Sequence, residues 1–366
     1  MMERRQIVAL WRRSTASVLV TLVRVEGSSY RRAGARLLIA ANGEYAGTIS
    51  GGCLEAEVVR KAAWMVREGA VLERYSTLFD DTAEIPFGLG CGGTVDLLME
   101  PAGTAECRAL FVAMEASLRG EDATVVTWLP GSGKPLERVV LGSAGAVTFG
   151  SEGLTGKRLA CAPGLQAGQE YTGQFVEELR APQRLLVLGA GDDAKPLVSI
   201  AGVLGWSVTV ADGRAQLARK ERFPEAKVVL SSTGDLDVRA EDAVVLMTHS
   251  YEQDRGLLTR MLPLAPRYLG LLGARHRSSL LVSEAAAMLG WSVAACCARI
   301  YAPVGLDLGG DGPEAIALAV IAEAQACCMS RLGASRRLSA EDVAEQIARG
   351  GASRYLQVQC AMDGTP

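Results

Sequence analysis

From Pro182 onward, short apolar segments alternate with longer helical patterns. The apolar segments are RLLVLGAG, SVTVADGR, KVVLSS, AVVLMTHS and YLGLLGAR, and RSSLLVSEAAAMLG and DGPEAIALAVIAEAQACCM are two of the helical ones. Strands that are apolar on both faces and alternate with helices are typical of a parallel sheet covered on both sides. The sequence therefore predicts an α/β fold with such a sheet over residues 182–330.

The first half of the chain has a different pattern. Segments with strand character are joined by glycine-rich and charged loops, and helical patterns begin at Leu54 and at Glu106. The strand segments include SVLVTLVRVE, ARLLIA, YAGTIS and TVDLLMEP. This mixture predicts an N-terminal α+β domain over residues 1–181. One capped helical pattern, LSAEDVAEQIARG, predicts a helical tail over residues 331–366.

Composition and charge exclude several classes of protein. The chain has 366 residues, a formal net charge of -3 and a pI near 5.7, which predicts no nucleic-acid partner. Its nine cysteines follow no disulfide-framework spacing, and no stretch is apolar enough to span a bilayer. We therefore expect a cytoplasmic protein without a membrane partner. A homo-oligomer, most simply a dimer, is the commonest assembly of such proteins.

A glycine motif follows the first strand of the second half. Gly189, Gly191 and Ala194 fit the pattern G-x-G-x-x-G/A, and the next strand ends in Asp212. This spacing predicts a Rossmann-like turn that would bind NAD(P) or another nucleotide, with Asp212 on a ribose diol. The alternative is a turn that only packs, because Asp192 and Asp193 place negative charge where phosphates would lie. Arg214 would suit a 2′-phosphate.

A cysteine stands at a strand-to-helix turn in the segment YAGTISGGCLEAEVV. Ser50, Gly51 and Gly52 precede Cys53, and the helical pattern starts at the next residue. Unpaired amide groups and the helix dipole favour a thiolate at such a position, and a thiolate is a nucleophile and a soft metal ligand. The alternative is a small apolar residue packed beneath a tight turn.

Two further loops of the first half carry candidate binding groups. In GLGCGG, glycines surround Cys91, and successive bare amides such as those of Gly92 and Gly93 can bind an anion. The loop GSSYRRAGAR is a candidate anion clamp. Its polar groups are Ser28, Ser29, Arg31, Arg32 and Arg36. A buried cysteine in a turn and a solvated basic loop are the corresponding structural alternatives.

His249 lies in THSYEQD, directly after an apolar strand. The carboxyl edge of a parallel sheet is where open α/β folds bind ligands, so His249 is a candidate binding residue. A structural histidine with satisfied hydrogen bonds is the alternative.

Together these segments resemble the XdhC/CoxI family of xanthine dehydrogenase accessory factors. The resemblance runs from about Val18 to Ala326 and includes EGSSYRRAGARLLI, GTISGGCLEAEVV, GLGCGGTVDLLMEP, LGAGDDAKPL and IYAPVGLDLGGDGPEAIALAVIAE. It implies a maturation protein that binds the molybdenum cofactor (molybdopterin) and delivers it, sulfurated, to a xanthine-dehydrogenase-type molybdenum hydroxylase. A cysteine desulfurase is a candidate further partner, and two alternatives stay open: the protein transfers sulfur itself, or it presents the cofactor to a desulfurase. Many relatives have His after Gly-Ala-Gly where this chain has Asp192.

The resemblance assigns the family's motifs to residues of this chain. The S-G-G-C motif falls on Ser50 to Cys53, the C-G-G motif on Cys91 to Gly93, and the G-S-S loop on Gly27 to Ser29. Cys53 would contact or shield molybdenum, or take part in sulfur handling. Two other functions stay open: an NAD(P)-dependent oxidoreductase that uses the Rossmann turn, and a scaffold that binds a hydroxylase without touching the cofactor.

Overall fold

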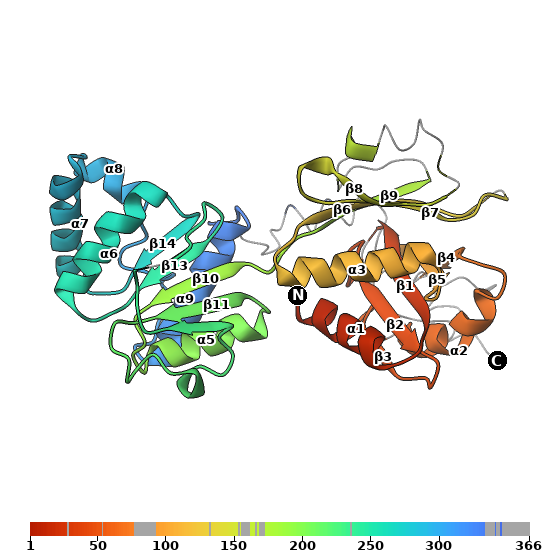
Figure 1. Ribbon diagram of the computed structural model, residues 1–366, viewed down its shortest axis with the longest axis horizontal. Coiled ribbons are helices and arrows are strands. Elements are labelled where there is room, and N and C mark those ends of the chain that lie inside the picture. Colours follow the sequence, from red (N-terminus) through yellow and green to blue (C-terminus); the bar gives the residue numbers. More distant parts are fainter. Residues whose placement is uncertain are drawn as a thin grey trace. The chain divides into compact units, whose positions relative to one another are not determined.

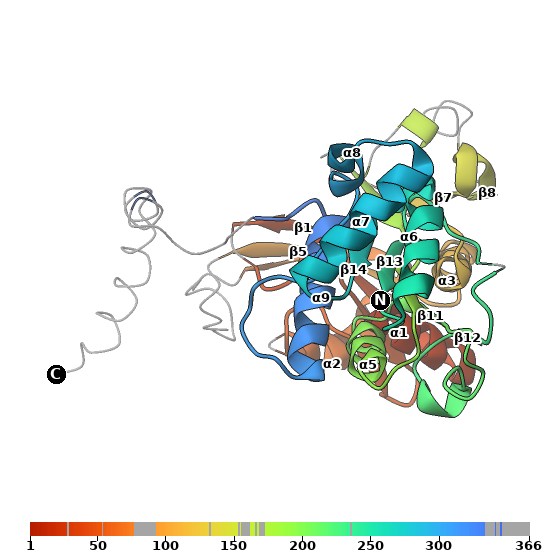
Figure 2. The same ribbon diagram turned by 90° about the vertical axis from the view of Figure 1, so that its left-hand side faces the viewer.

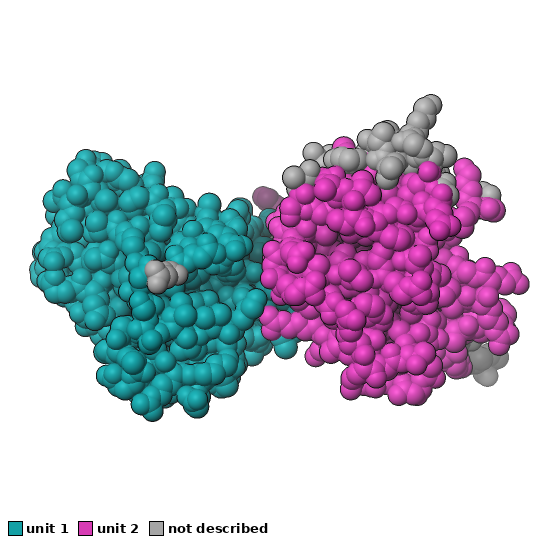
Figure 3. All heavy atoms as spheres, viewed as in Figure 1, with its two compact units in different colours: residues 1–2, 182–334 teal, residues 3–181, 335–366 magenta. Residues whose placement is uncertain are grey.

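The chain forms two compact units in the computed structural model (Figure 3). The antiparallel unit comprises Glu3–Ala181, and the parallel-sheet unit comprises Met1–Met2 and Pro182–Ala334. The structure describes residues 1–333, apart from residues 28, 53, 77–92, 132, 153, 155–161, 165–166, 168–172 and 235, together with residues 341 and 345. The tail predicted for residues 331–366 therefore lies almost wholly outside the described residues.

The antiparallel unit is built on a sheet of strand order β3-β2-β1-β5-β4 (Figure 1). Its strands are β1 (Ala16–Glu26), β2 (Arg36–Ala40), β3 (Tyr45–Gly47), β4 (Val71–Ser76) and β5 (Thr94–Pro101). Its helices are α1 (Met2–Arg13), α2 (Glu55–Met65) and α3 (Ala105–Arg119). Leu19 packs in a core with α1 and α3, whereas Val18 and Val20 pack with α2. The alternation of side chains along β1 thus buries both faces of the sheet.

A second antiparallel sheet, of order β8-β7-β6-β9, packs in the same unit. It comprises β6 (Ala123–Trp128), β7 (Glu137–Leu141), β8 (Val147–Gly150) and β9 (Gln174–Leu179), with 3-10 turns η1 (Ser143–Gly145) and η2 (Ala162–Gly164). Val125, Val140 and Leu179 share the core of α1 and α3. The two sheets are therefore joined through one hydrophobic cluster.

The parallel-sheet unit has strand order β12-β11-β10-β13-β14, and every pairing in it is parallel. Helices α5 and α9 cover one face, and α6 and α7 cover the other (Figures 1 and 2). The strands are β10 (Arg184–Leu188), β11 (Ser207–Ala211), β12 (Val228–Leu230), β13 (Ala243–Leu246) and β14 (Tyr268–Leu271). The helices are α5 (Ala194–Val203), η3 (Lys220–Arg222), α6 (Tyr251–Leu264), α7 (Arg275–Leu289), α8 (Val293–Cys297) and α9 (Pro313–Cys328).

These two units confirm the predicted fold class: a Rossmann-like parallel sheet with helices on both faces, preceded by an α+β region. Within the described part of the chain, no helix is both long enough and apolar enough to cross a membrane.

Candidate functional site

The three loop motifs of the first half adjoin strand ends at the same end of the antiparallel sheet. Glu26, the last residue of β1, lies opposite Thr94, the first residue of β5. Gly47, the last residue of β3, lies opposite Leu37 near the start of β2. The G-S-S loop leaves β1, the S-G-G-C turn leaves β3, and the C-G-G segment enters β5. The three motifs therefore face the same end of the sheet, but at different levels: Gly47 lies beside Leu37, which is opposite Val20, six residues before Glu26.

The turn after β3 is organised around the carboxylate of Glu55, the first residue of α2. Among described residues, Glu55 accepts five hydrogen bonds, and its side chain is buried. The donors are the Thr48 and Ser50 hydroxyls and the backbone amides of Ile49, Ser50 and Gly52, each amide at 2.9 Å. The turn thus wraps around an internal anion.

This arrangement changes the chemistry expected at the turn. Burial raises the pKa of Glu55, but the hydrogen bonds from Ser50 and Thr48 outweigh burial and lower the pKa to about 2. The Leu54 amide donates to the Ser50 hydroxyl at 2.8 Å. The sequence suggested unpaired amides at this helix start, whereas the structure gives the amides of Ile49, Ser50, Gly52 and Leu54 partners inside the turn.

The basic loop lies beside this turn. The carboxylate of Glu3 in α1 accepts from the Thr48 amide at 2.7 Å and pairs with Arg31, so it bridges the two segments. The Tyr30 ring fills the space where a Cβ on Gly51 would lie, 2.8 Å from that position. Ser29, at the start of this loop, is partly exposed, as is Ser50 in the turn.

The three arginines of the basic loop have different surroundings. Arg31 pairs with Glu3, and Arg36 is buried in β2, where it pairs with Glu177 of β9. Arg32 is exposed. Arg36 is therefore placed as a link between the sheets, and Arg32 is the most exposed arginine of the three.

The exposed part of the turn is bare backbone. Gly51 and Gly52 are exposed and have φ angles of +91° and +117°, which favour glycine, and no atom lies within 4 Å of a Cβ built on Gly52. A flat group can therefore approach the backbone at Gly52. Gly93 is buried at the start of β5. Four predicted site residues lie outside the described residues: Ser28, Cys53, Cys91 and Gly92.

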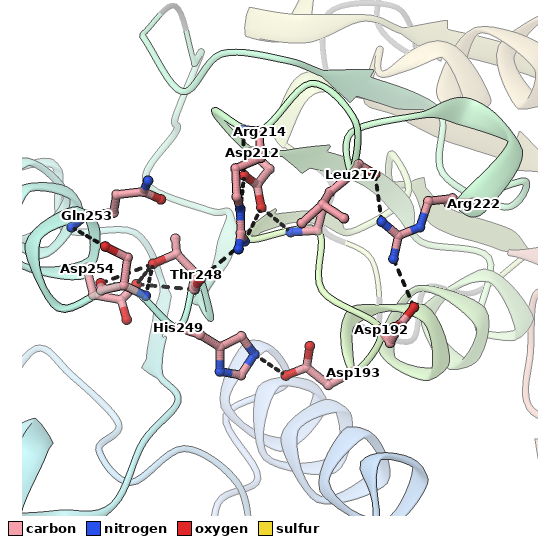
Figure 4. A network of polar contacts seen from close by, with 12 residues as sticks. Asp192, Asp193, Asp212, Arg214, Leu217, Arg222, Thr248, His249, Gln253 and Asp254 are labelled. Carbon is pink, nitrogen blue, oxygen red and sulfur yellow. Dashed lines mark hydrogen bonds and ion pairs between the residues drawn. The ribbon is translucent and has the colours of Figure 1, made fainter.

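The predicted residues of the second half follow the carboxyl ends of strands of the parallel sheet. Figure 4 shows two of them, Asp212 with Arg214 and His249 with Asp193. Gly189 and Gly191 follow β10, Asp212 follows β11, and His249 follows β13 by three residues. Gly189 has φ +129°, and a Cβ on it would lie 2.2 Å from the carbonyl oxygen of Met247. Close contact between the turns after β10 and β13 therefore requires glycine at position 189.

Asp193 and His249 occupy the space above Gly191. A Cβ on Gly191 would lie 2.4 Å from Asp193 Oδ1, and His249 Nε2 lies 2.8 Å from Asp193 Oδ2. His249 has φ +61°, an uncommon conformation for a residue other than glycine. In a dinucleotide site the second glycine lets the backbone approach the pyrophosphate. Here a carboxylate fills that position.

Asp212 is also engaged within the protein. Its carboxylate accepts from the Ala190 amide at 2.8 Å, from the Arg214 amide at 2.8 Å, and from Nε and Nη2 of Arg214 at 2.9 and 2.7 Å. Arg214 Nη2 also donates to the carbonyl of Thr248 at 3.2 Å. Burial raises the pKa of Asp212, but the Arg214 and amide hydrogen bonds outweigh it and hold the pKa below its ordinary value of 3.8.

These residues do not fit NAD(P). A dinucleotide needs a bare backbone at the second glycine, a carboxylate free to bind the ribose diol, and a helix start without negative charge. Asp193 covers Gly191, and Arg214 occupies Asp212, whose side chain is 0% exposed. Asp192 lies at the start of α5, where it pairs with Lys195 and Arg222.

Several residues that fix the turns after β3 and β13 were not predicted from the sequence. Asp254 is fully buried, accepts from the Thr248 hydroxyl at 2.7 Å and pairs with Arg277 at 2.6 Å, which ties the turn after β13 to α7. Glu55 had no capping-box signal, because it directly follows the N-cap Leu54, whereas a capping-box glutamate stands three residues after the N-cap. Glu3 had no signal either, since its partners lie far along the chain.

Metal ligands do not gather elsewhere in the described part of the chain. Where the structure describes side chains, no three His, Cys, Asp or Glu residues come together in a way that would hold a metal ion.

The parallel sheet and its glycine turn define the second half as a Rossmann domain. Residues 185–324 match the model of the XdhC Rossmann domain, and residues 10–76 match that of the XdhC and CoxI family. The chain belongs to the XdhC and CoxI family.

Named relatives and a solved structure extend along most of the chain. The chain is 29% identical over 324 residues to a probable xanthine dehydrogenase subunit of Bacillus subtilis, covering 84% of this chain and 92% of that one. It is 26% identical over 309 residues to the molybdenum cofactor insertion chaperone PaoD of Escherichia coli, covering 84% and 82%. A crystal structure of a xanthine dehydrogenase from Bacillus halodurans superposes with a TM-score of 0.77 at 27% identity, covering 94% of this chain and 99% of that one.

Proposed function

We propose that this protein is a maturation factor that binds the molybdenum cofactor and delivers it, sulfurated, to a xanthine-dehydrogenase-type molybdenum hydroxylase. The observation that carries the proposal is the contact between the loop after β1 and the turn after β3, where Tyr30 packs against Gly51 and Glu3 bridges Thr48 and Arg31. The name of PaoD, a molybdenum cofactor insertion chaperone, supports the same role.

The chemistry of the molybdenum cofactor suits the groups in the three loop motifs of the first half. Molybdopterin carries a phosphate, a flat pterin and a metal held by soft dithiolene sulfurs, and soft metals select thiolate ligands. We assign the phosphate to the basic loop of Ser28, Ser29 and Arg32, where the exposed guanidinium provides charge-assisted donors. The pterin would lie against the bare backbone at Gly51 and Gly52. Cys53 and Cys91 would contact or shield the metal.

The protein acts in this proposal as a carrier rather than as a turnover enzyme. It protects the cofactor from water and oxidant, and it presents the cofactor to a cysteine desulfurase, which supplies the terminal sulfur. The hydroxylase and the desulfurase would have to share a compartment with this protein, and we propose that this compartment is the cytoplasm. A homodimer is proposed on general grounds only.

A dinucleotide-dependent oxidoreductase is favoured only by the Rossmann fold and its glycine turn, and side chains of the protein occupy the positions that NAD(P) would need. A scaffold that only binds a hydroxylase predicts that the S-G-G-C turn is dispensable.

Delivery can be tested with a cofactor-free hydroxylase. Protein purified from a cofactor-producing host is mixed with a cofactor-free xanthine dehydrogenase, with and without a cysteine desulfurase, and the gain of hydroxylation activity is followed. We expect activation by wild type, loss of activation with Cys53→Ala, and unchanged activation with Cys297→Ala, which removes an exposed cysteine of the parallel-sheet unit. Equal activation by all three proteins would contradict the assignment of Cys53, and no activation by any would contradict delivery.

A further inference from the structure

The Glu55 carboxylate anchors the backbone on both sides of position 53. On one side, the Gly52 amide donates to Glu55 Oε2 at 2.9 Å. On the other, the Leu54 amide donates at 2.8 Å to the Ser50 hydroxyl, which itself donates to Glu55 Oε2. The residues that flank Cys53 in sequence are therefore both tied to one carboxylate oxygen, directly or through Ser50.

The other carboxylate oxygen fixes the rest of the turn. Glu55 Oε1 accepts from the amides of Ile49 and Ser50 and from the Thr48 hydroxyl. The Thr48 hydroxyl also accepts from the Gly51 amide at 3.0 Å. Gly51 and Gly52 contribute no side chains to the turn, and both have left-handed φ angles. The shape of the turn is thus set by one buried carboxylate rather than by packing of its own side chains.

We propose that Glu55 is the positioning residue of the S-G-G-C turn, holding its backbone in the conformation that receives the molybdenum cofactor. This inference rests on the proposed function. Glu55 acts through the turn, and its own carboxylate has no free position with which to bind cargo, because each oxygen already accepts at least two hydrogen bonds.

The arrangement requires a carboxylate and not merely a polar side chain of the same size. All five donors point at Glu55, so an amide in its place would turn an NH₂ group toward either the Gly52 amide or the amides of Ile49 and Ser50. Donor would face donor at one end in either orientation. Glu55→Gln therefore releases part of the turn while nearly preserving side-chain volume.

The test combines amide exchange with cofactor retention in the full-length protein. Hydrogen–deuterium exchange is measured over residues 46–56, and molybdenum and oxidised-pterin fluorescence are measured in protein from a cofactor-producing host. The matched control is Glu57→Gln, which removes the same charge from the same helix, where Glu57 pairs with Lys61. Val58→Ala, a buried residue of α2, controls for general destabilisation.

We expect Glu55→Gln to speed exchange in this segment roughly 10–100-fold, because charge-assisted hydrogen bonds are lost. Cofactor retention should fall about 10–100-fold, as is typical when a group that orients ligands is removed. Both controls should leave the exchange of residues 46–52 and cofactor retention near wild type. Thr48→Val, a milder change that keeps Glu55, should give a smaller effect in the same direction and serves if Glu55→Gln fails to fold.

The two arms separate failure of this inference from failure of the proposed function. Wild-type retention of cofactor with equal retention by Glu55→Gln and Thr48→Val would overturn the inference and leave the carrier function intact. If wild type holds no cofactor, the proposed function falls together with the receiving role of the turn. Unchanged exchange in Glu55→Gln would overturn the positioning role in either case.

Discussion

A buried ion pair joins the two sheets of the antiparallel unit and gives the sharpest test of what stabilises it. Arg138 of β7 donates to both oxygens of Glu100 in β5, Nη1 to Oε2 and Nη2 to Oε1, each at 2.9 Å. The side chains are 2% and 1% exposed. Arg138 also donates to the Thr127 hydroxyl at 3.0 Å and to the carbonyl of Glu106 at 2.9 Å. Neither charge has access to water.

Replacing Glu100 with Gln should be strongly destabilising. The guanidinium keeps its bonds to Thr127 and Glu106 but loses its counter-charge in a site without solvent. Removing one partner of a buried pair typically costs about 3–5 kcal/mol, because the remaining charge is uncompensated. Replacing both partners, as in Glu100→Leu with Arg138→Met, removes the two charges together. We expect that double variant to lie within about 1–2 kcal/mol of wild type.

The free energies of unfolding would be compared by urea titration of the full-length chain, followed by circular dichroism and by fluorescence. Agreement between the two probes is needed, because a chain of two units can unfold in more than one step. A loss below about 1 kcal/mol for Glu100→Gln, or a double variant less stable than the single one, would refute the reasoning.

Three other predictions concern the parallel-sheet unit and the glycine turns. Gly189→Ala should lower the free energy of unfolding by about 1–3 kcal/mol more than Gly69→Ala does. Both glycines have positive φ angles, but of the two only Gly189 is crowded by backbone atoms. Thermal unfolding of the two variants would measure the difference. Asp212→Asn should cost about 1–3 kcal/mol at neutral pH. The pKa of Asp212 is lowered in the folded protein, so its ionised carboxylate stabilises the fold above the ordinary pKa of 3.8, and this stabilisation is lost as the pH falls below that value. A difference in free energy of unfolding between wild type and Asp212→Asn that grows in acid would contradict this. Isothermal titration with NADH and NADPH should show binding no tighter than about 1 mM, and micromolar binding would show that the side chains around Gly191 move aside.

Much of the fold could be predicted from the sequence, because apolar periodicity and capping residues are local signals. The segment TVDLLMEP is strand β5 with the predicted bounds, and Pro313 stands in the first turn of α9 as expected. Helix α1 was not predicted. Its buried residues Ile7, Val8 and Leu10 are too few to stand out in a segment rich in arginine.

The sequence predicted individual candidate residues of both sites but not the contacts that those residues make. The motifs at Ser29, Ser50 and Gly93 are visible in the sequence, yet which of them lie together depends on tertiary contacts such as that of Tyr30 with Gly51. Arg214 folds back over two residues to donate to the Asp212 carboxylate. Sequence spacing does not predict this contact. Sequence patterns identify groups that can bind, and tertiary contacts decide which of them are already engaged.

The carrier function itself is tested by the molybdenum and pterin content of the protein purified from a cofactor-producing host. Wild type would be measured beside Cys53→Ala and Cys91→Ala, with Cys297→Ala as the control. We predict near-stoichiometric cofactor in wild type and in the control, and loss of cofactor from Cys53→Ala. Wild-type protein that neither retains cofactor nor can be loaded with it would contradict the proposal.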